Sequence, residues 1–161
     1  MQSQIESSMY LVGQVFQLPT LLLISLLFLY AFWVLGEFGV LAWRRRNGQG
    51  KALLAEFRRQ PDLTDDTLDV LAHKMLEAPR IASRVAPMLG LVATMIPMGP
   101  ALKSLSDGNL ALVSGNLTVA FSAVILALIA ASITYWVVNV RRRWLAEELL
   151  ESAAIKQGSA Q

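Results

Sequence analysis

Residues 110–140 read LALVSGNLTVAFSAVILALIAASITYWVVNV, without a single charged side chain. At about 1.5 Å per residue, a helix over this stretch exceeds the ~30 Å hydrocarbon core of a bilayer. Two further apolar stretches precede it: residues 18–43, interrupted only by Glu37, and residues 85–102, which end before Lys103. We therefore expect an all-α integral membrane protein with three transmembrane helices.

Composition supports this fold class. Of 161 residues, 55% are hydrophobic and 16% are charged, whereas soluble domains carry about 25% charged residues. The chain has no cysteine and one histidine, His73, which excludes disulfides and thiolate chemistry and argues against a metal site within one chain. We expect no metal, no cofactor, no catalytic residues and no nucleic-acid partner.

Basic residues predict the topology. Arg44–Arg46 follow the first apolar stretch and Arg141–Arg143 follow the third, whereas the opposite ends of the stretches have only Lys103. By the positive-inside rule the N-terminus is outside and the C-terminus is cytoplasmic. The predicted segments are 1–17 outside, 18–43 membrane, 44–84 cytoplasmic and helical, 85–103 membrane, 104–109 outside, 110–140 membrane, and a cytoplasmic helical tail at 141–161.

The cytoplasmic segment has local helix signals. We expect a helix over 51–60 that ends at Pro61, and a second helix capped by Thr64. Its apolar residues recur at helical spacing and form one face: Leu68, Leu71, Met75 and Leu76. Asp62, Asp65, Asp66 and Asp69 lack the spacing of a calcium-binding loop, so we interpret them as capping and surface groups, and His73 as a surface residue.

Glu37 is the one acid inside an apolar stretch, which makes it a candidate functional group. One interpretation is an ion pair with an arginine at the cytoplasmic interface. The other is a role in ion movement or assembly.

The second stretch carries small residues on one helix face: Ala86, Gly90, Thr94, Pro97 and Ala101. Small residues let another helix approach closely. We expect Pro87 and the run Pro97-Met98-Gly99-Pro100 to kink this helix. Thr94 either serves packing or belongs to a narrow polar pathway.

The third stretch has two opposed stripes. One contains Ala120, Ala123, Ala127, Ala131 and Thr134, which suits tight helix contact. The other contains Thr118, Ser122, Ile125, Ile129 and Ser132. Its hydroxyls either line a pore or bond to carbonyls of their own helix.

The residues Ala86-Pro87, Leu89-Gly90-Leu91 and Thr94 resemble the Ala-Pro-x-x-Gly-Leu-x-Gly-Thr motif of the MotA/TolQ/ExbB proton-channel family. Three spans with a short cytoplasmic segment after the first are similar to the TolQ/ExbB branch. The sequence departs from the family pattern in both spans. In the second span, Ala93 stands for the glycine before the threonine and Pro97 for the glycine after it. In the third span, Val119 stands for an acid that is often present, and Ala123 and Val124 stand where a threonine is usual.

The resemblance implies a ring of subunits, a pentamer, around an ExbD/TolR-like partner that has one span and a membrane aspartate. It also implies a multi-pass protein of the prokaryotic inner membrane, a stator that converts proton flow into mechanical work. Thr94, Thr118, Ser122 and Ser132 are then the pore-lining candidates. Two alternatives are a non-conducting scaffold, motivated by Ala123 and Val124, and a small-solute transporter with a discontinuous second span and a site near Glu37.

Overall fold

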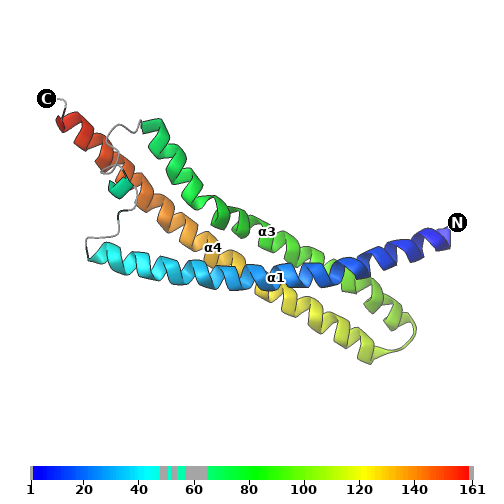
Figure 1. The fold of residues 1–161 in the computed structure, drawn as a ribbon. Helices are drawn as coiled ribbons and strands as arrows, with labels where there is room; N and C mark the ends of the chain where they lie inside the picture. The colour runs from blue at the N-terminus through cyan, green and yellow to red at the C-terminus, as the bar shows by residue number, and fades with distance from the viewer. Residues whose placement is uncertain (1, 48–50, 52–53, 57–64, 160–161) are drawn as a thin grey trace. The chain divides into compact units, whose positions relative to one another are not determined.

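The structure, a computed structural model, describes residues 2–47, 51, 54–56 and 65–159. Three long helices account for nearly all of them: α1 (Gln2–Arg46), α3 (Asp65–Ser106) and α4 (Leu110–Ser159) (Figure 1). These ranges contain no strand. Each helix includes a stretch long and apolar enough to cross a membrane, which confirms the predicted all-α membrane protein. The ring and the orientation stay predictions.

The helices are longer than the predicted spans. α1 begins upstream of residue 18, and α4 continues past the arginines at 141–143 to Ser159. Charged residues mark where a bilayer would end, but they do not stop a helix, because Arg and Glu are good helix formers. Most of the helix predicted at 51–60, its end at Pro61, Asp62 and the Thr64 cap lie outside the described residues.

α3 passes through Pro87, Pro97 and Pro100 and remains helical throughout. A proline removes one backbone N–H, so the carbonyl four residues earlier loses its helical donor. Helices in membranes tolerate this loss when neighbouring helices cover the site, and Pro97 is fully buried. The unbroken helix contradicts the discontinuous second span that the solute-transporter hypothesis predicts. The kink itself stays a prediction.

A turn of three residues joins α3 to α4. Gly108 has φ +74°, and its N–H donates to the carbonyl of Leu105 while the Asn109 N–H donates to that of Ser104 at 2.8 Å. This is a Schellman motif, in which glycine adopts the left-handed conformation that ends a helix. Asn109 then caps α4, because its Oδ1 accepts the Leu112 N–H at 3.2 Å. One short turn therefore ends one long helix and starts the next.

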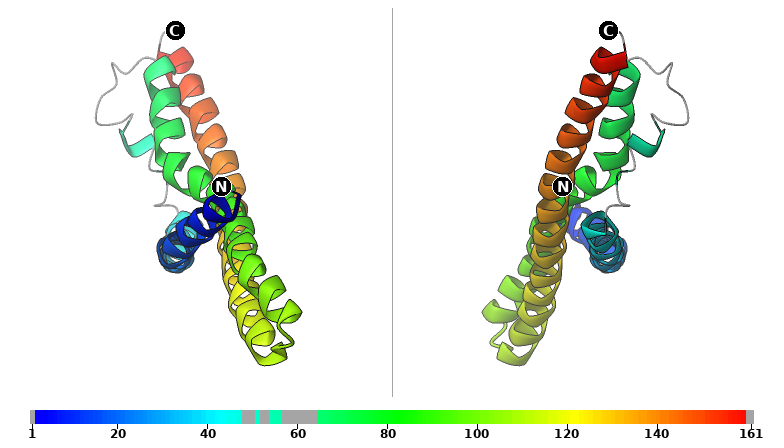
Figure 2. Two further views of the ribbon diagram at one scale, coloured as in Figure 1. Left: turned by 90° about the vertical axis from the view of Figure 1, so that its right-hand side faces the viewer. Right: turned by 90° about the vertical axis from the view of Figure 1, so that its left-hand side faces the viewer.

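The chain divides into two compact units, and each helix contributes to both. The first unit comprises Met1–Ala31 and Ala82–Ser132. In it the C-terminal part of α3 and the N-terminal part of α4 lie side by side down to the turn (Figures 1 and 2). Its core is built from Ile24, Ala93, Ala123 and Ala127, with Leu21, Leu89 and Leu126 packed against it.

The second unit comprises Phe32–Ile81 and Ile133–Gln161. Its core joins the start of α3 to the end of α4 through Leu68, Ala72, Leu76 and Leu145, with Met75 and Leu149 packed against it. The predicted apolar face of residues 68–76 therefore has a partner helix. His73 is exposed, as predicted, and its Nδ1 lies 2.9 Å from the Asp69 carbonyl oxygen.

Candidate functional site

The hydroxyl stripe of α4 lies on the surface of the first unit. Thr118, Ser122 and Ser132 are exposed, and each hydroxyl donates to the carbonyl four residues earlier at 2.8 Å. A hydroxyl that donates its proton keeps its oxygen lone pairs as acceptors. The stripe therefore offers a row of acceptor oxygens without any charge.

Thr94 is the corresponding hydroxyl of α3, and it is half-buried. Its hydroxyl donates to the Leu91 carbonyl at 2.7 Å. The residue of that turn that enters the core is Ala93, which is 5% exposed. Thr94 consequently lies at the margin of the α3–α4 contact, with its oxygen accessible.

The small residues of α3 and the alanines of α4 face each other. On α3, Ala86 and Pro97 are almost completely buried, as is Gly90. On α4, Ala120, Ala123 and Ala127 are at most 3% exposed. A Cβ placed on Gly90 would lie 3.0 Å from the Cβ of Ala127 and 3.7 Å from the Cα of Val124, so an alanine there would require its neighbour to shift by a few tenths of an ångström. Gly99, by contrast, is exposed and has no neighbour within 4 Å of such a Cβ.

Glu37 belongs to the second unit and forms an ion pair with Arg141 at 3.2 Å. This geometry agrees with the interpretation of Glu37 as a partner of an interfacial arginine. The Glu37 side chain is 51% exposed, whereas that of Arg141 is 16% exposed. The carboxylate therefore neutralises a largely enclosed guanidinium.

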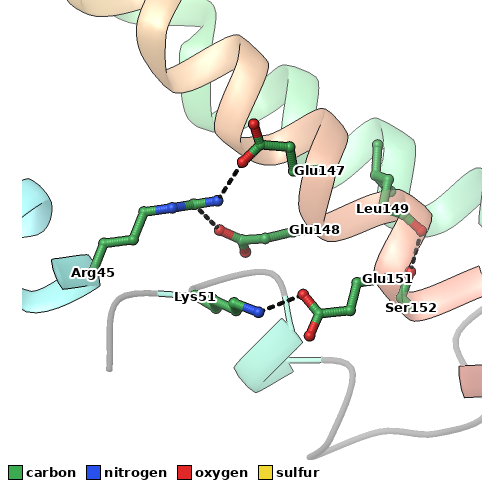
Figure 3. Close-up of polar contacts among 7 residues, drawn as sticks. All are labelled: Arg45, Lys51, Glu147, Glu148, Leu149, Glu151 and Ser152. Carbon is green, nitrogen blue, oxygen red and sulfur yellow. Dashed lines mark hydrogen bonds and ion pairs between the residues drawn. The ribbon is translucent and has the colours of Figure 1, made fainter. Parts of the chain in front are cut away.

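Further ion pairs connect the end of α1 with the tail of α4 (Figure 3). The guanidinium of Arg45 donates to Glu148 at 2.7 Å and to Glu147 at 2.9 Å. Lys51 forms another pair with Glu151. The Glu148 side chain is only 3% exposed, so burial makes its charge sensitive to the loss of this guanidinium. We call the contacts of Glu37, Arg45 and Lys51 with α4 the ion-pair ladder.

Aromatic contacts reinforce the ladder. Phe38 of α1 stacks on Trp144 of α4 at 5.1 Å between ring centroids, and it meets Trp136 edge-on at the same distance. The Arg45 guanidinium lies 5.0 Å from the centroid of the Trp144 ring, a distance at which the ring attracts the cation. These contacts fix α1 and α4 side by side within the second unit.

Sequence reasoning missed the ion pairs of Arg45 and Lys51, whereas a pair of Glu37 with an interfacial arginine was one of its interpretations. A signal was present, since Glu147, Glu148 and Glu151 cluster on the tail of α4 while basic residues cluster at the end of α1. The partners are about one hundred positions apart, however, and no local spacing rule connects such residues. Among the described residues, no group of three or more histidines and acids could hold a metal ion.

A sequence profile described as the MotA/TolQ/ExbB proton channel family matches residues 53–153. The chain belongs to this family. The match includes all of α3 and most of α4, the two helices that carry the small-residue contact and the hydroxyl stripe. No individual curated protein and no solved structure matches the chain.

MotA/TolQ/ExbB membership and the three apolar helices agree that this is a membrane protein of a channel and energy-transducing family. Proteins of this family work in oligomeric complexes with partner proteins. The match covers the candidate positions Thr94, Thr118, Ser122 and Ser132.

Proposed function

We propose that the chain is a stator-like subunit of a proton channel driven by the proton motive force in a prokaryotic inner membrane. The observation that carries the proposal is the division of α4 into a buried alanine side and an exposed hydroxyl side, in a chain of this family. The alanine side is used within the chain, so the hydroxyl side is free to face a pore.

The predicted topology is part of this proposal. The N-terminus and the α3–α4 turn lie outside, and the two arginine triplets and the tail lie in the cytoplasm. Several subunits, a pentamer in the proposal, form a ring around an ExbD/TolR-like helix. Proton flow turns or rocks this partner against the ring and so performs work outside the membrane.

The charges of this chain suggest what the ring and its partner each contribute to proton transfer. Residues 110–140 contain no acid, base or histidine, and residues 85–102 contain none either. Glu37, the acid of the first apolar stretch, is paired with Arg141, so we propose that the proton carrier comes from another chain and is the membrane aspartate of the partner. The hydroxyl oxygens of Thr94, Thr118 and Ser122 would accept hydrogen bonds from water or hydronium beside that aspartate.

Proton flux through the purified complex tests the proposal. The complex with its co-purified small subunit is placed in proteoliposomes, and the internal pH is followed with a dye after a potassium diffusion potential is applied. We expect Thr94→Val and Ser122→Ala each to lower flux about 3- to 10-fold, the cost of one hydrogen bond in the transition state. Native mass spectrometry checks that the subunit ratio is unchanged.

Ser25→Ala is the matched control. Ser25 of α1 is exposed, and its hydroxyl donates to the carbonyl of Leu21 at 2.9 Å, the same local bond that Ser122 makes to Thr118. Loss of this hydroxyl should leave flux unchanged. Normal flux in a correctly assembled Thr94→Val complex would remove Thr94 from the pathway.

A non-conducting scaffold is the second candidate, and the position of Ala123 favours it. Ala123 stands where the family usually has a threonine, and it is 3% exposed within the core of the first unit. A packing residue has replaced a polar one at that turn. The scaffold predicts an intact ring with no flux above that of empty liposomes, and the flux assay on the unmodified complex decides between the two functions.

A further inference from the structure

In each arginine triplet, one side chain forms an ion pair and the other two are exposed. Arg45 and Arg141 are enclosed, with side chains 18% and 16% exposed, and each is paired with glutamate in the ion-pair ladder. The other four arginines are exposed and form no ion pair with any described residue: Arg44, Arg46, Arg142 and Arg143. Each triplet therefore retains two available guanidinium groups.

After the ion pairs of the ladder are counted, the region where α1 and α4 meet keeps a net positive charge. The six arginines exceed their three glutamate partners, Glu37, Glu147 and Glu148, by three positive charges. Lys51 and Glu151 balance each other. The aromatic and ionic contacts hold the two helices together, so the exposed arginines of both triplets lie on neighbouring helices of the second unit. We call Arg44, Arg46, Arg142 and Arg143 the basic surface.

The place of the arginine triplets in the sequence indicates which ligand this surface binds. Both triplets follow directly after apolar stretches that end at Trp43 and Val140, so the guanidinium groups lie at the depth of lipid headgroups. Trp43 and Trp136 are exposed beside them, at 68% and 54%, and tryptophan favours the same interface. A free polyanion in water would not require aromatic rings beside its site.

We propose that Arg44, Arg46, Arg142 and Arg143 bind the phosphate headgroups of anionic phospholipids in the leaflet that they face. Topology alone requires only positive charge, which lysine supplies equally well, yet both triplets consist entirely of arginine. The planar guanidinium binds phosphate oxygens through two parallel hydrogen bonds, and lysine does not. This inference does not depend on proton conduction and goes beyond the proposed function.

Quenching of tryptophan fluorescence by brominated lipids tests the proposal. The full chain in neutral detergent is titrated with brominated phosphatidylglycerol and, separately, with brominated phosphatidylcholine. We expect saturable quenching with a clear preference for phosphatidylglycerol. Each arginine should contribute about fivefold in affinity, so Arg44→Gln/Arg142→Gln should weaken phosphatidylglycerol binding about 25-fold and leave phosphatidylcholine binding unchanged. Arg46→Gln/Arg143→Gln is a second, independent pair.

Lys74→Gln/Lys103→Gln is the matched control, because it removes the same charge from exposed positions outside the surface. Its preference for phosphatidylglycerol should equal that of the unmodified chain. The proposal fails if the control loses as much affinity as the arginine variants, or if the unmodified chain binds both lipids equally. It also fails if millimolar inorganic phosphate displaces the lipid completely, since the site would then take free phosphate.

Discussion

Adding one methyl group at Gly90 tests the closest contact between α3 and α4. In Gly90→Ala the new Cβ would lie 3.0 Å from the Cβ of Ala127, a separation at which one of the two helices has to move. Overpacking of this kind costs about 1–3 kcal/mol. The same substitution stabilises the helix by up to about 1 kcal/mol, because alanine has the higher helix propensity.

Gly39→Ala separates the cost of the contact from the gain in helix propensity. Gly39 lies inside α1, is exposed, and a Cβ there meets nothing within 4 Å. Gly99 would not serve, because it precedes Pro100 and a proline disfavours a helical residue with a Cβ before it. Gly90→Ala and Gly39→Ala gain a similar helix propensity, so their difference in stability measures the cost of the contact. We expect Gly90→Ala to be about 1–3 kcal/mol less stable than Gly39→Ala.

Unfolding in mixed micelles of increasing sodium dodecyl sulfate, followed by circular dichroism, gives both stabilities. Adding Ala127→Gly to Gly90→Ala makes room for the new methyl group, and the double-mutant cycle should show a favourable coupling of about 1 kcal/mol or more. Equal stability of Gly90→Ala and Gly39→Ala would refute the reasoning, because α3 and α4 would then not approach as closely as described.

Three further predictions concern the ladder and the turn, and the same unfolding assay measures each. Arg45→Gln should lower the free energy of unfolding by about 2–4 kcal/mol, because the buried Glu148 loses this cation. Lys51→Gln breaks an exposed pair and should lower it by less than about 1 kcal/mol. Equal losses for the two variants would show that burial of the pair does not affect its contribution. Glu37→Gln should lower the free energy of unfolding by about 1–2 kcal/mol, because the largely enclosed guanidinium of Arg141 loses its carboxylate partner. It should leave proton flux unchanged, and a large loss of flux would assign Glu37 to the pathway. Gly108→Ala should lower the free energy of unfolding by about 1 kcal/mol, because residues with a Cβ disfavour the left-handed conformation of Gly108. An unchanged stability would show that the turn does not require this conformation.

Periodicity predicted the packing surfaces because they depend on local spacing. In the predicted stripe of α4, alanines recur every three or four residues and are buried, and the hydroxyls on the opposite stripe are exposed. Thr94 shows how precise such reasoning is. The spacing predicts Thr94 on the small-residue face, but in the structure the adjacent Ala93 enters the core, and on a helix one residue rotates the side-chain direction by about 100°.

The ion pairs of Arg45 and Lys51 could not be predicted in the same way. Arg45 and Glu148 are 103 positions apart, and their contact depends on how α1 meets α4, which no residue spacing specifies. Charge predicts where the membrane ends, which stays a prediction, but charge does not predict the helix ends. α4 continues to Ser159 because its tail, Leu145-Ala146-Glu147-Glu148-Leu149-Leu150-Glu151, consists of good helix formers.

The short turn at Gly108 has a consequence for the order in which the chain acquires its contacts. Closing a loop costs more entropy as the loop lengthens, and α3 meets α4 across a connection of only three residues, 107–109. The contacts of α1 with α4 must close about one hundred residues. We therefore expect the contacts of the α3–α4 hairpin to form earlier than the contacts between α1 and the tail of α4.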